Sequence, residues 1–220
     1  MGSIRGVLLD SGGVLIRPIG GRWNPRRDFE PTVLEVAPHL TEADFARAID
    51  AGERFFETAP PDATRDDYHR ALLDEIDVPV TESLLATLGR PLEPNTIVEP
   101  FPEVLDVLHE LRRRGLRLGC VTDNGPGIER LHEGLGIREF FEVYAISAVL
   151  GCTKPDPRMF HHASEALGLR PEECLFVDDV PALVVAAGEL GYYGVALERE
   201  GPTEVANTSI ADLNQVLDLI

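Results

Sequence analysis

The sequence predicts an α/β fold in which a mainly parallel sheet carries helices on both faces. Two observations lead to this prediction. Short apolar runs of strand length alternate with helical patterns over most of the chain, which is typical of strand–helix–strand units. Polar residues also follow several of these runs, at the positions where parallel sheets present functional side chains. The expected architecture is Rossmann-like, with one inserted segment that is almost free of strand patterns.

Five apolar runs are expected to form the sheet. The first ends at Asp10, and the chain breakers Gly12 and Gly13 follow it closely. Thr122 and the pair Asp178–Asp179 follow two of the later runs. The five runs cover residues 4–9, 116–121, 143–150, 174–177 and 193–197.

Helical patterns lie between these runs. Pro102 opens a helix in which Val104, Leu105, Leu108 and Leu111 repeat at helical spacing, and Gly115 closes it. Asp156 followed by Pro157 has the form of an N-cap and a first-turn proline for the next helix. Residues 181–190 are rich in alanine and valine and are expected to form a helix buried against the sheet.

The segment 17–98 departs from this alternation. Thr41 and Thr64 each stand three residues before an aspartate, which is the capping-box pattern that begins helices. We therefore expect a helical domain at 17–98, inserted after the first strand. Residues 1–16 and 99–220 then form one discontinuous core.

Composition excludes several classes of function. The formal net charge of -18 disfavours binding to nucleic acid or to an anionic membrane surface. The three cysteines are odd in number and widely spaced, which favours reduced thiols in a cytoplasmic protein. No apolar run reaches transmembrane length. The sequence carries no signal for an oligomeric state.

Lys154 is the single lysine of the chain, whose other nineteen basic side chains are arginines. An ammonium is a compact point charge, whereas a guanidinium is a larger planar fork. One lysine falls somewhere by chance, so its neighbours decide whether it has a role. Lys154 follows one strand run, and Asp10, Thr122 and Asp178–Asp179 end others. A nucleophile, a hydroxyl, an ammonium and paired carboxylates are thus expected at one edge of the sheet.

This set of residues resembles the haloacid dehalogenase-like hydrolase superfamily. The matching motifs are Asp10-Ser-Gly-Gly-Val-Leu15, Val121-Thr122, Gly151-x-x-Lys154-Pro-Asp-Pro157 and Phe176-Val-Asp-Asp179. The resemblance covers the core, and the inserted segment matches the family's cap in position, size and helical character.

The resemblance implies a Mg²⁺-dependent phosphatase that acts on a small phosphorylated metabolite. Asp10 would be the nucleophile that forms an aspartyl-phosphate. Asp10, the backbone carbonyl of Gly12, and Asp179 would hold Mg²⁺, with Asp178 supporting the ion directly or through water. Thr122, Asp123, Asn124 and Lys154 are expected at the substrate phosphate. Hard oxygen ligands suit Mg²⁺, and a carboxylate that attacks an anionic phosphate needs cations beside it.

One departure from the family pattern concerns the second catalytic aspartate, because Gly12 stands in its place. General acid–base catalysis contributes about 10²- to 10⁴-fold, so reduced turnover is expected. Three interpretations follow: a phosphatase for good leaving groups or with an acid from the cap or Asp123, a metal-independent 2-haloacid dehalogenase, or a regulatory protein that binds metal or phosphate. The cluster Arg22, Trp23, Arg26 and Arg27 is basic and aromatic, and it could contact a phosphate or a ring of the substrate. We favour the alternative of an arginine-rich solvated loop with Trp23 packed on the cap.

Overall fold

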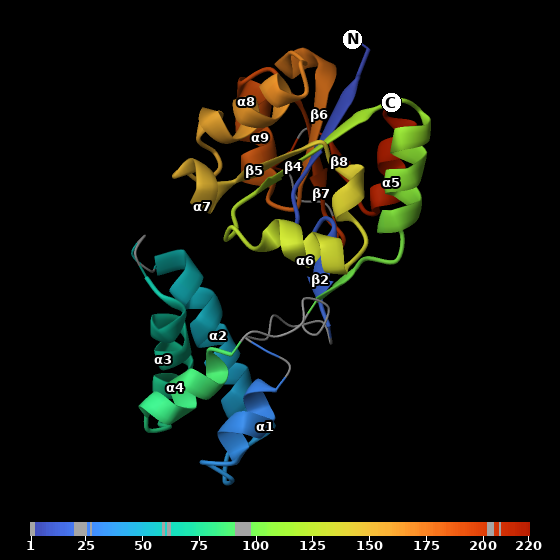
Figure 1. Cartoon of the computed structure of the whole chain (residues 1–220). Coiled ribbons are helices and arrows are strands. Elements are labelled where there is room, and N and C mark those ends of the chain that lie inside the picture. The colour runs from blue at the N-terminus through green and yellow to red at the C-terminus, as the bar shows by residue number, and fades with distance from the viewer. Residues whose placement is uncertain are drawn as a thin grey trace. The chain divides into compact units, whose positions relative to one another are not determined.

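The computed structural model describes residues 3–19, 26, 28–58, 60, 63–90, 98–201, 205–206 and 208–220. The chain divides into two compact units, of which unit 1 comprises Met1–Arg17 with Glu99–Ile220 and unit 2 comprises Pro18–Val98. Each unit contains its own cluster of buried apolar side chains. Figure 1 shows the elements of both units.

Unit 1 is built on a six-stranded sheet in the order β5-β4-β1-β6-β7-β8. Every strand pairs in parallel with its neighbours. The mainly parallel sheet expected from the sequence is thus confirmed, and β8 is a short additional strand at its edge. The strands are β1 (Gly6–Leu9), β4 (Arg117–Thr122), β5 (Val143–Ile146), β6 (Cys174–Asp178), β7 (Tyr193–Leu197) and β8 (Ser209–Ile210).

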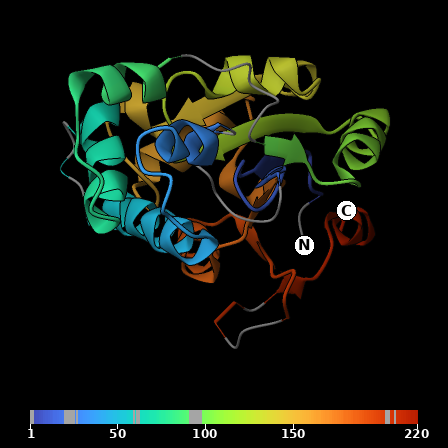
Figure 2. The ribbon, with the colours of Figure 1, turned by 90° about the horizontal axis from the view of Figure 1, so that it is seen from below.

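Helices cover both faces of this sheet. Side chains alternate between the two faces along a strand, and every residue of β1 and β6 is buried, so both faces must be covered. Helix α8 packs on β4 and β5, α9 packs on β6 and β7, and α5 lies beside the C-terminal η4 (Figures 1 and 2). The helices are α5 (Val104–Arg113), α6 (Ile128–Gly134), α7 (Ser147–Leu150), α8 (Pro157–Ala166) and α9 (Pro181–Glu189), with the 3₁₀ turns η2 (Arg138–Phe140), η3 (Pro171–Glu173) and η4 (Leu213–Asp218).

The local signals for these helices act as expected. The Asp156 side chain accepts a 2.9 Å hydrogen bond from the backbone N–H of Arg158 and caps α8, and Pro157 occupies its first turn. The apolar side of α5 differs in one position from the expected pattern. Leu105 is 40% exposed, whereas Val107 is fully buried in its place.

The run 143–150 forms two elements instead of one. Strand β5 ends at Ile146, which pairs with Thr122 at the end of β4. The helix α7 begins directly at Ser147. Pairing along β4 therefore sets the end of β5, and apolar composition alone does not reveal it.

Unit 2 consists of α1 (Phe29–Leu34), α2 (Glu42–Thr58), α3 (Arg65–Glu75) and α4 (Glu82–Leu88) among the described residues. The predicted capping box at Thr64 forms in full with Asp67, and the Thr41 N–H donates the corresponding hydrogen bond to the Asp44 carboxylate. Two short strands, β2 (Ile16–Pro18) and β3 (Val98–Pro100), pair where the chain leaves and re-enters unit 1. No helix of the described ranges is long and apolar enough to cross a membrane.

Candidate active site

Three neighbouring strands bring the sequence motifs to one edge of the sheet. Strand β1 lies between β4 and β6, and its last residue, Leu9, pairs with Cys120 on one side and Val177 on the other. Asp10 follows β1 at once, and its N–H donates to the carbonyl of Val177. This register brings Asp10 to the level of Asp178 at the end of β6. The carboxyl ends of parallel strands are where such sheets bind ligands.

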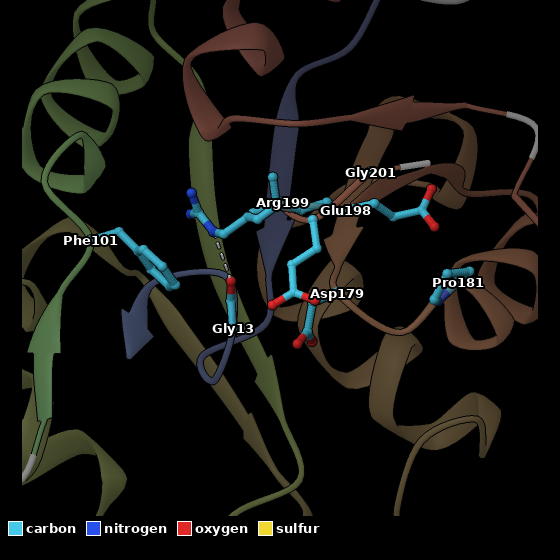
Figure 3. A pocket seen from close by; sticks show the side chains of 9 residues that line it. Gly13, Phe101, Asp179, Pro181, Glu198, Arg199 and Gly201 are labelled. Carbon is cyan, nitrogen blue, oxygen red and sulfur yellow. Dashed lines mark hydrogen bonds between the residues drawn. The ribbon is translucent and has the colours of Figure 1, made fainter. Parts of the chain in front are cut away.

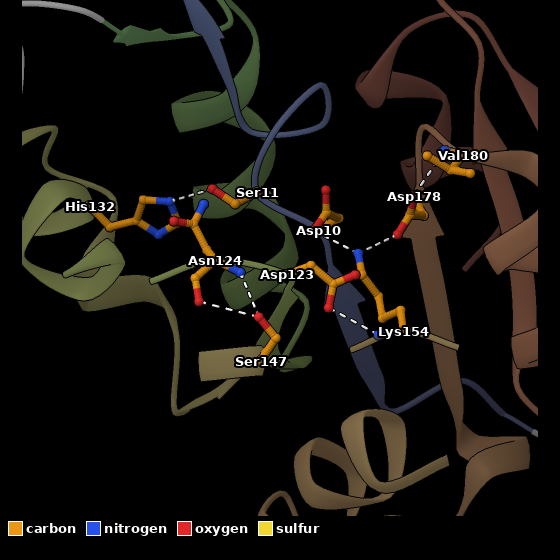
Figure 4. Close-up of polar contacts among 9 residues, drawn as sticks. All are labelled: Asp10, Ser11, Asp123, Asn124, His132, Ser147, Lys154, Asp178 and Val180. Atoms are coloured by element: carbon orange, nitrogen blue, oxygen red, sulfur yellow. Dashed lines mark hydrogen bonds and ion pairs between the residues drawn. The ribbon is translucent and has the colours of Figure 1, made fainter. Parts of the chain in front are cut away.

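Lys154 joins two of these acidic residues. Its Nζ donates to Asp10 Oδ1 at 2.8 Å and to Asp178 Oδ2 at 2.6 Å (Figure 4). The lysine side chain is buried, and burial alone lowers the pKa of an ammonium. The charges and hydrogen bonds of Asp10 and Asp178 outweigh burial, so the pKa of Lys154 lies above its usual value. The lone lysine is therefore a cation held between carboxylates.

Asp179 completes a group of three carboxylates with Asp10 and Asp178, whose oxygens lie within 4.8 Å of one another. Burial and then the charge of Asp10 raise the pKa of Asp178 to about 7. The side chain of Asp179 is exposed at the rim, yet the surrounding protein removes part of its hydration. Together with Asp10 this raises the pKa of Asp179 to about 6.

This donor set fits a divalent cation. One ammonium does not balance three ionised carboxylates. The raised pKa values of Asp178 and Asp179 reflect burial first and then the negative charge of Asp10. Hard carboxylate oxygens are the ligands that Mg²⁺ prefers. The residues present can therefore hold Mg²⁺.

The other predicted site residues differ in their contacts. Asp123 Oδ1 accepts a 2.9 Å hydrogen bond from the backbone N–H of Lys154. The Asp123 side chain is exposed, yet the surrounding protein removes part of its hydration and so raises the pKa of its carboxyl. Thr122 is buried at the end of β4. Asn124 is exposed and contacts α7, because its N–H donates to the Ser147 hydroxyl at 2.9 Å (Figure 4). Asp123 is thus hydrogen-bonded to the backbone of Lys154, whereas Asn124 is hydrogen-bonded to the first residue of α7.

Two features of the structure require glycine at position 13. Its φ of 73° lies in the left-handed region that favours glycine. A Cβ built on it would stand 1.9 Å from Asp179 Oδ2. The turn after β1 therefore approaches the carboxylate group closely because Gly13 has no side chain.

Sequence reasoning missed two side chains that hold this turn. His132 of α6 lies 2.8 Å from the Ser11 hydroxyl, and Arg199 donates to the carbonyls of Gly13 and Val14. Ser11 and His132 are separated by 121 residues. No spacing pattern links positions so far apart, so their contact could be found only in the folded chain.

The basic and aromatic cluster expected near the start of unit 2 is described at one residue, Arg26. Its guanidinium is buried, pairs with Asp28 and donates to the carbonyls of Thr87 and Leu88 at the end of α4. Arg26 thus packs inside unit 2, whereas the favoured interpretation expected the arginines of this cluster to be solvated. The other three members, Arg22, Trp23 and Arg27, lie outside the described residues.

Comparisons with known proteins find a matching family model and several relatives. A family model described as haloacid dehalogenase-like hydrolase matches residues 4–191. The chain is 36% identical over 122 residues to the phosphoserine phosphatase of Thermus thermophilus, which covers 53% of this chain and 49% of that protein. It is 33% identical over 103 residues to the (S)-2-haloacid dehalogenase of Pseudomonas sp., covering 46% and 44%.

Solved structures share the fold over the whole chain. The crystal structure of a HAD phosphatase from Thermococcus onnurineus superposes with a TM-score of 0.64 at 22% identity, covering 98% of this chain and 97% of that one. At this identity the likeness establishes the fold alone. The aligned regions span 36% to 56% of the length of three curated phosphatase relatives.

Proposed function

Because the chain belongs to the haloacid dehalogenase-like hydrolases, we propose that it is a Mg²⁺-dependent phosphatase that acts on a small phosphorylated metabolite through Asp10. One observation carries this proposal: the Lys154 ammonium is held between Asp10 and Asp178, with Asp179 completing the carboxylate group. Relatives named as phosphatases for phosphoserine and for glyceraldehyde 3-phosphate support a small phosphorylated substrate.

In the proposed first step Asp10 attacks the phosphorus of the substrate. A bond forms between the carboxylate oxygen and phosphorus, and the bond between phosphorus and the leaving oxygen breaks. The leaving oxygen takes up a proton from water or from a nearby acid and departs as the product alcohol. Lys154 donates a hydrogen bond to Asp10 and would offset the charge shared between the carboxylate and the phosphate. Water then hydrolyses the aspartyl-phosphate, which releases phosphate and restores Asp10.

We assign the remaining site residues supporting parts in this reaction. Asp10, the Gly12 carbonyl and Asp179 would hold Mg²⁺ with support from Asp178. The ion would neutralise charge that builds up on the transferring group. Thr122 would donate to a phosphoryl oxygen, while Asp123 and Asn124 shape the adjacent loop. Unit 2 would act as the family's cap and select the substrate.

Gly12 limits the reaction that this site catalyses. No side chain at that position protonates the leaving group or activates the water, and such catalysis contributes about 10²- to 10⁴-fold. We therefore propose slow turnover that favours substrates with a good leaving group, such as a sugar 1-phosphate. Asp123 does not belong to the group of three carboxylates, and its side chain accepts a hydrogen bond from the backbone of Lys154. It is therefore our candidate for a replacement acid.

A 2-haloacid dehalogenase is the second candidate, since a curated relative carries that name and Gly12 removes the phosphatase aspartate. The charge balance disfavours it. Halide displacement has little use for the two further carboxylates, Asp178 and Asp179, that stand beside the nucleophile. A third possibility is a regulatory protein that binds metal or phosphate without turnover.

The deciding experiment assays phosphate release from a panel of phosphorylated metabolites and an aryl phosphate, with Mg²⁺ and with EDTA. We expect release that requires Mg²⁺ and that Asp10→Asn abolishes. The same preparations are tested for chloride release from 2-chloropropionate. Metal-independent chloride release would replace the phosphatase proposal with the dehalogenase, and an inert wild type on every substrate would favour the binding protein.

A further inference from the structure

The buried side chain of His132 contacts the first residue of the turn Ser11–Val14. The Ser11 carbonyl accepts the backbone N–H groups of Leu15 and Ile16, and its side chain is fully buried. The Ser11 hydroxyl points away from Asp10 and meets the His132 ring at 2.8 Å (Figure 4). Both the backbone and the side chain of Ser11 are therefore fixed.

His132 is itself held in one orientation. Its Nε2 meets Ser11, and its Nδ1 meets the Tyr144 hydroxyl at 2.9 Å. The residue is fully buried, and burial together with the nearby Arg138 lowers the pKa of the imidazole to about 4. A neutral ring has one donor nitrogen and one acceptor nitrogen, and here each has a partner. His132 thus links Ser11 to β5 through Tyr144.

Arg199 forms hydrogen bonds with the other end of the turn. Its Nε donates to the Gly13 carbonyl and its Nη2 to the Val14 carbonyl, both at 3.2 Å. The guanidinium lies 3.5 Å from the centre of the Phe101 ring and pairs with Glu103 at 2.7 Å. Figure 3 shows the guanidinium directed at the Gly13 carbonyl, beside Asp179.

Gly12 lies between Ser11, which contacts His132, and Gly13, which contacts Arg199. Glycine has the largest backbone freedom of any residue, and the Gly12–Gly13 pair supplies no side chain that could restrict the turn. The Gly12 carbonyl is a metal ligand in the proposed function. An ion gains affinity when its ligands are already in place, so the fixed peptides on either side affect how tightly the metal is held.

We propose that His132, through Ser11, and Arg199 are positioning residues that clamp the Ser11–Val14 turn and hold the Gly12 carbonyl ready for the metal. Neither side chain touches the reacting atoms. The inference rests on the proposed function, because it concerns the same metal site. It adds His132, Ser11 and Arg199 to the residues that determine metal affinity.

A matched pair of variants tests the histidine side of the clamp. Ser11→Ala leaves His132 Nε2 without its partner, and Tyr144→Phe leaves Nδ1 without its partner, so each creates the same kind of buried defect. Mn²⁺ binding to the resting protein is measured by electron paramagnetic resonance, with thermal unfolding recorded in EDTA. We expect Ser11→Ala to weaken Mn²⁺ binding about 10-fold. Tyr144→Phe keeps the contact between Ser11 and His132. It is therefore expected to lower the unfolding temperature similarly but to weaken Mn²⁺ binding less than Ser11→Ala does.

Arg199→Met tests the other side, because it removes both carbonyl contacts and keeps an apolar side chain against Phe101. It is also expected to weaken Mn²⁺ binding about 10-fold, and kcat at saturating Mg²⁺ should fall less than the affinity does.

If Ser11→Ala does not fold, His132→Gln and His132→Asn replace it, since glutamine presents its amide near the Nε2 position and asparagine near Nδ1. Glutamine should then retain more Mn²⁺ affinity than asparagine.

The outcomes separate this inference from the proposed function. A wild-type protein that binds no Mn²⁺ contradicts the proposed metal site and the clamp with it. A wild type that binds Mn²⁺ and releases phosphate, with unchanged affinity in Ser11→Ala and Arg199→Met, overturns the clamp alone. Equal loss of affinity in Ser11→Ala and Tyr144→Phe assigns His132 a general role in stability and also rejects the inference.

Discussion

Lys154 occupies a position where the size of the cation matters as much as its charge. Its Nζ lies within 2.8 Å of Asp10 and Asp178 in a buried setting. A guanidinium is wider and presents its donors in a plane, so it does not fit between the same two oxygens. Lysine is kept at this position although arginine serves at the other basic positions of the chain.

We predict that Lys154→Arg lowers kcat/KM for phosphate release by about 10²- to 10³-fold, as the loss of one charge-stabilising donor does in other active sites. Steady-state kinetics at saturating Mg²⁺ measure this effect. The matched control is Arg113→Lys, the reverse exchange at an exposed helix position, which should leave kcat/KM unchanged. Wild-type kinetics in Lys154→Arg would mean that charge alone is required there.

Gly12 permits a second prediction at the scale of one residue. The left-handed glycine of the turn is Gly13, so a substitution at Gly12 leaves the position with φ of 73° intact. If a missing acid limits turnover, Gly12→Asp should raise kcat on alkyl phosphates by about 10-fold or more, since poor leaving groups depend most on protonation. The aryl phosphate, whose leaving group needs little protonation, should gain much less. An equal change on both substrates, or a loss on both, would point to altered loop geometry or to another acid.

Most elements of the core could be predicted because local signals mark them. Asp156 and Pro157 define the start of α8 through one side-chain bond and one restricted backbone angle, and neither depends on the rest of the fold. Strands β1 and β6 are fully buried, and such strands read as continuous apolar runs. The predicted range 193–197 equals β7, an apolar run whose last three residues are buried.

The end of β5 could not be predicted because it depends on a distant partner. The run 143–150 is apolar beyond Ile146, so composition continues the strand. In the fold β4 ends at Thr122, where it pairs with Ile146. The next residue, Ser147, accepts a hydrogen bond through its hydroxyl from the N–H of Asn124 in the loop after β4. The contact between Ser11 and His132 is unpredictable for a related reason, since a hydrogen bond between remote residues leaves no periodic trace. The Asp10, Lys154 and Asp178 grouping was accessible because each residue ends or follows a recognisable strand.

The charge of the whole molecule complicates any test of metal binding. The formal charge of -18 means that added salt of any kind screens repulsion and can stabilise the fold. A specific site differs because it binds the folded state alone and stabilises it by mass action. That contribution is about 2.7 kcal/mol when free ligand reaches 100 times Kd.

The pH dependence follows from the carboxylates of the site. Asp178 and Asp179 have folded pKa values of about 7 and 6, above the ordinary value of 3.8. Without metal the folded state therefore holds more protons than the unfolded state, and this contribution to stability is lost as pH rises from about 4 through 7. Mg²⁺ requires the ionised carboxylates, so at pH 5 it competes with protons and at pH 8 it does not.

We therefore predict that Mg²⁺ at 100 times its Kd at pH 8 raises the unfolding temperature of unit 1 by roughly 5–10 °C at that pH, from about 2–4 °C per kcal/mol for a chain of this size. The same Mg²⁺ concentration should raise it by much less at pH 5. Differential scanning calorimetry against NaCl at equal ionic strength separates this shift from screening. Asp179→Asn should remove most of the Mg²⁺ increment at pH 8, while its response to NaCl stays that of the wild type. If Mg²⁺ and NaCl of equal ionic strength raised the transition equally at pH 8, the stabilisation would come from the charge of the whole surface. The carboxylate group would then have no specific metal affinity.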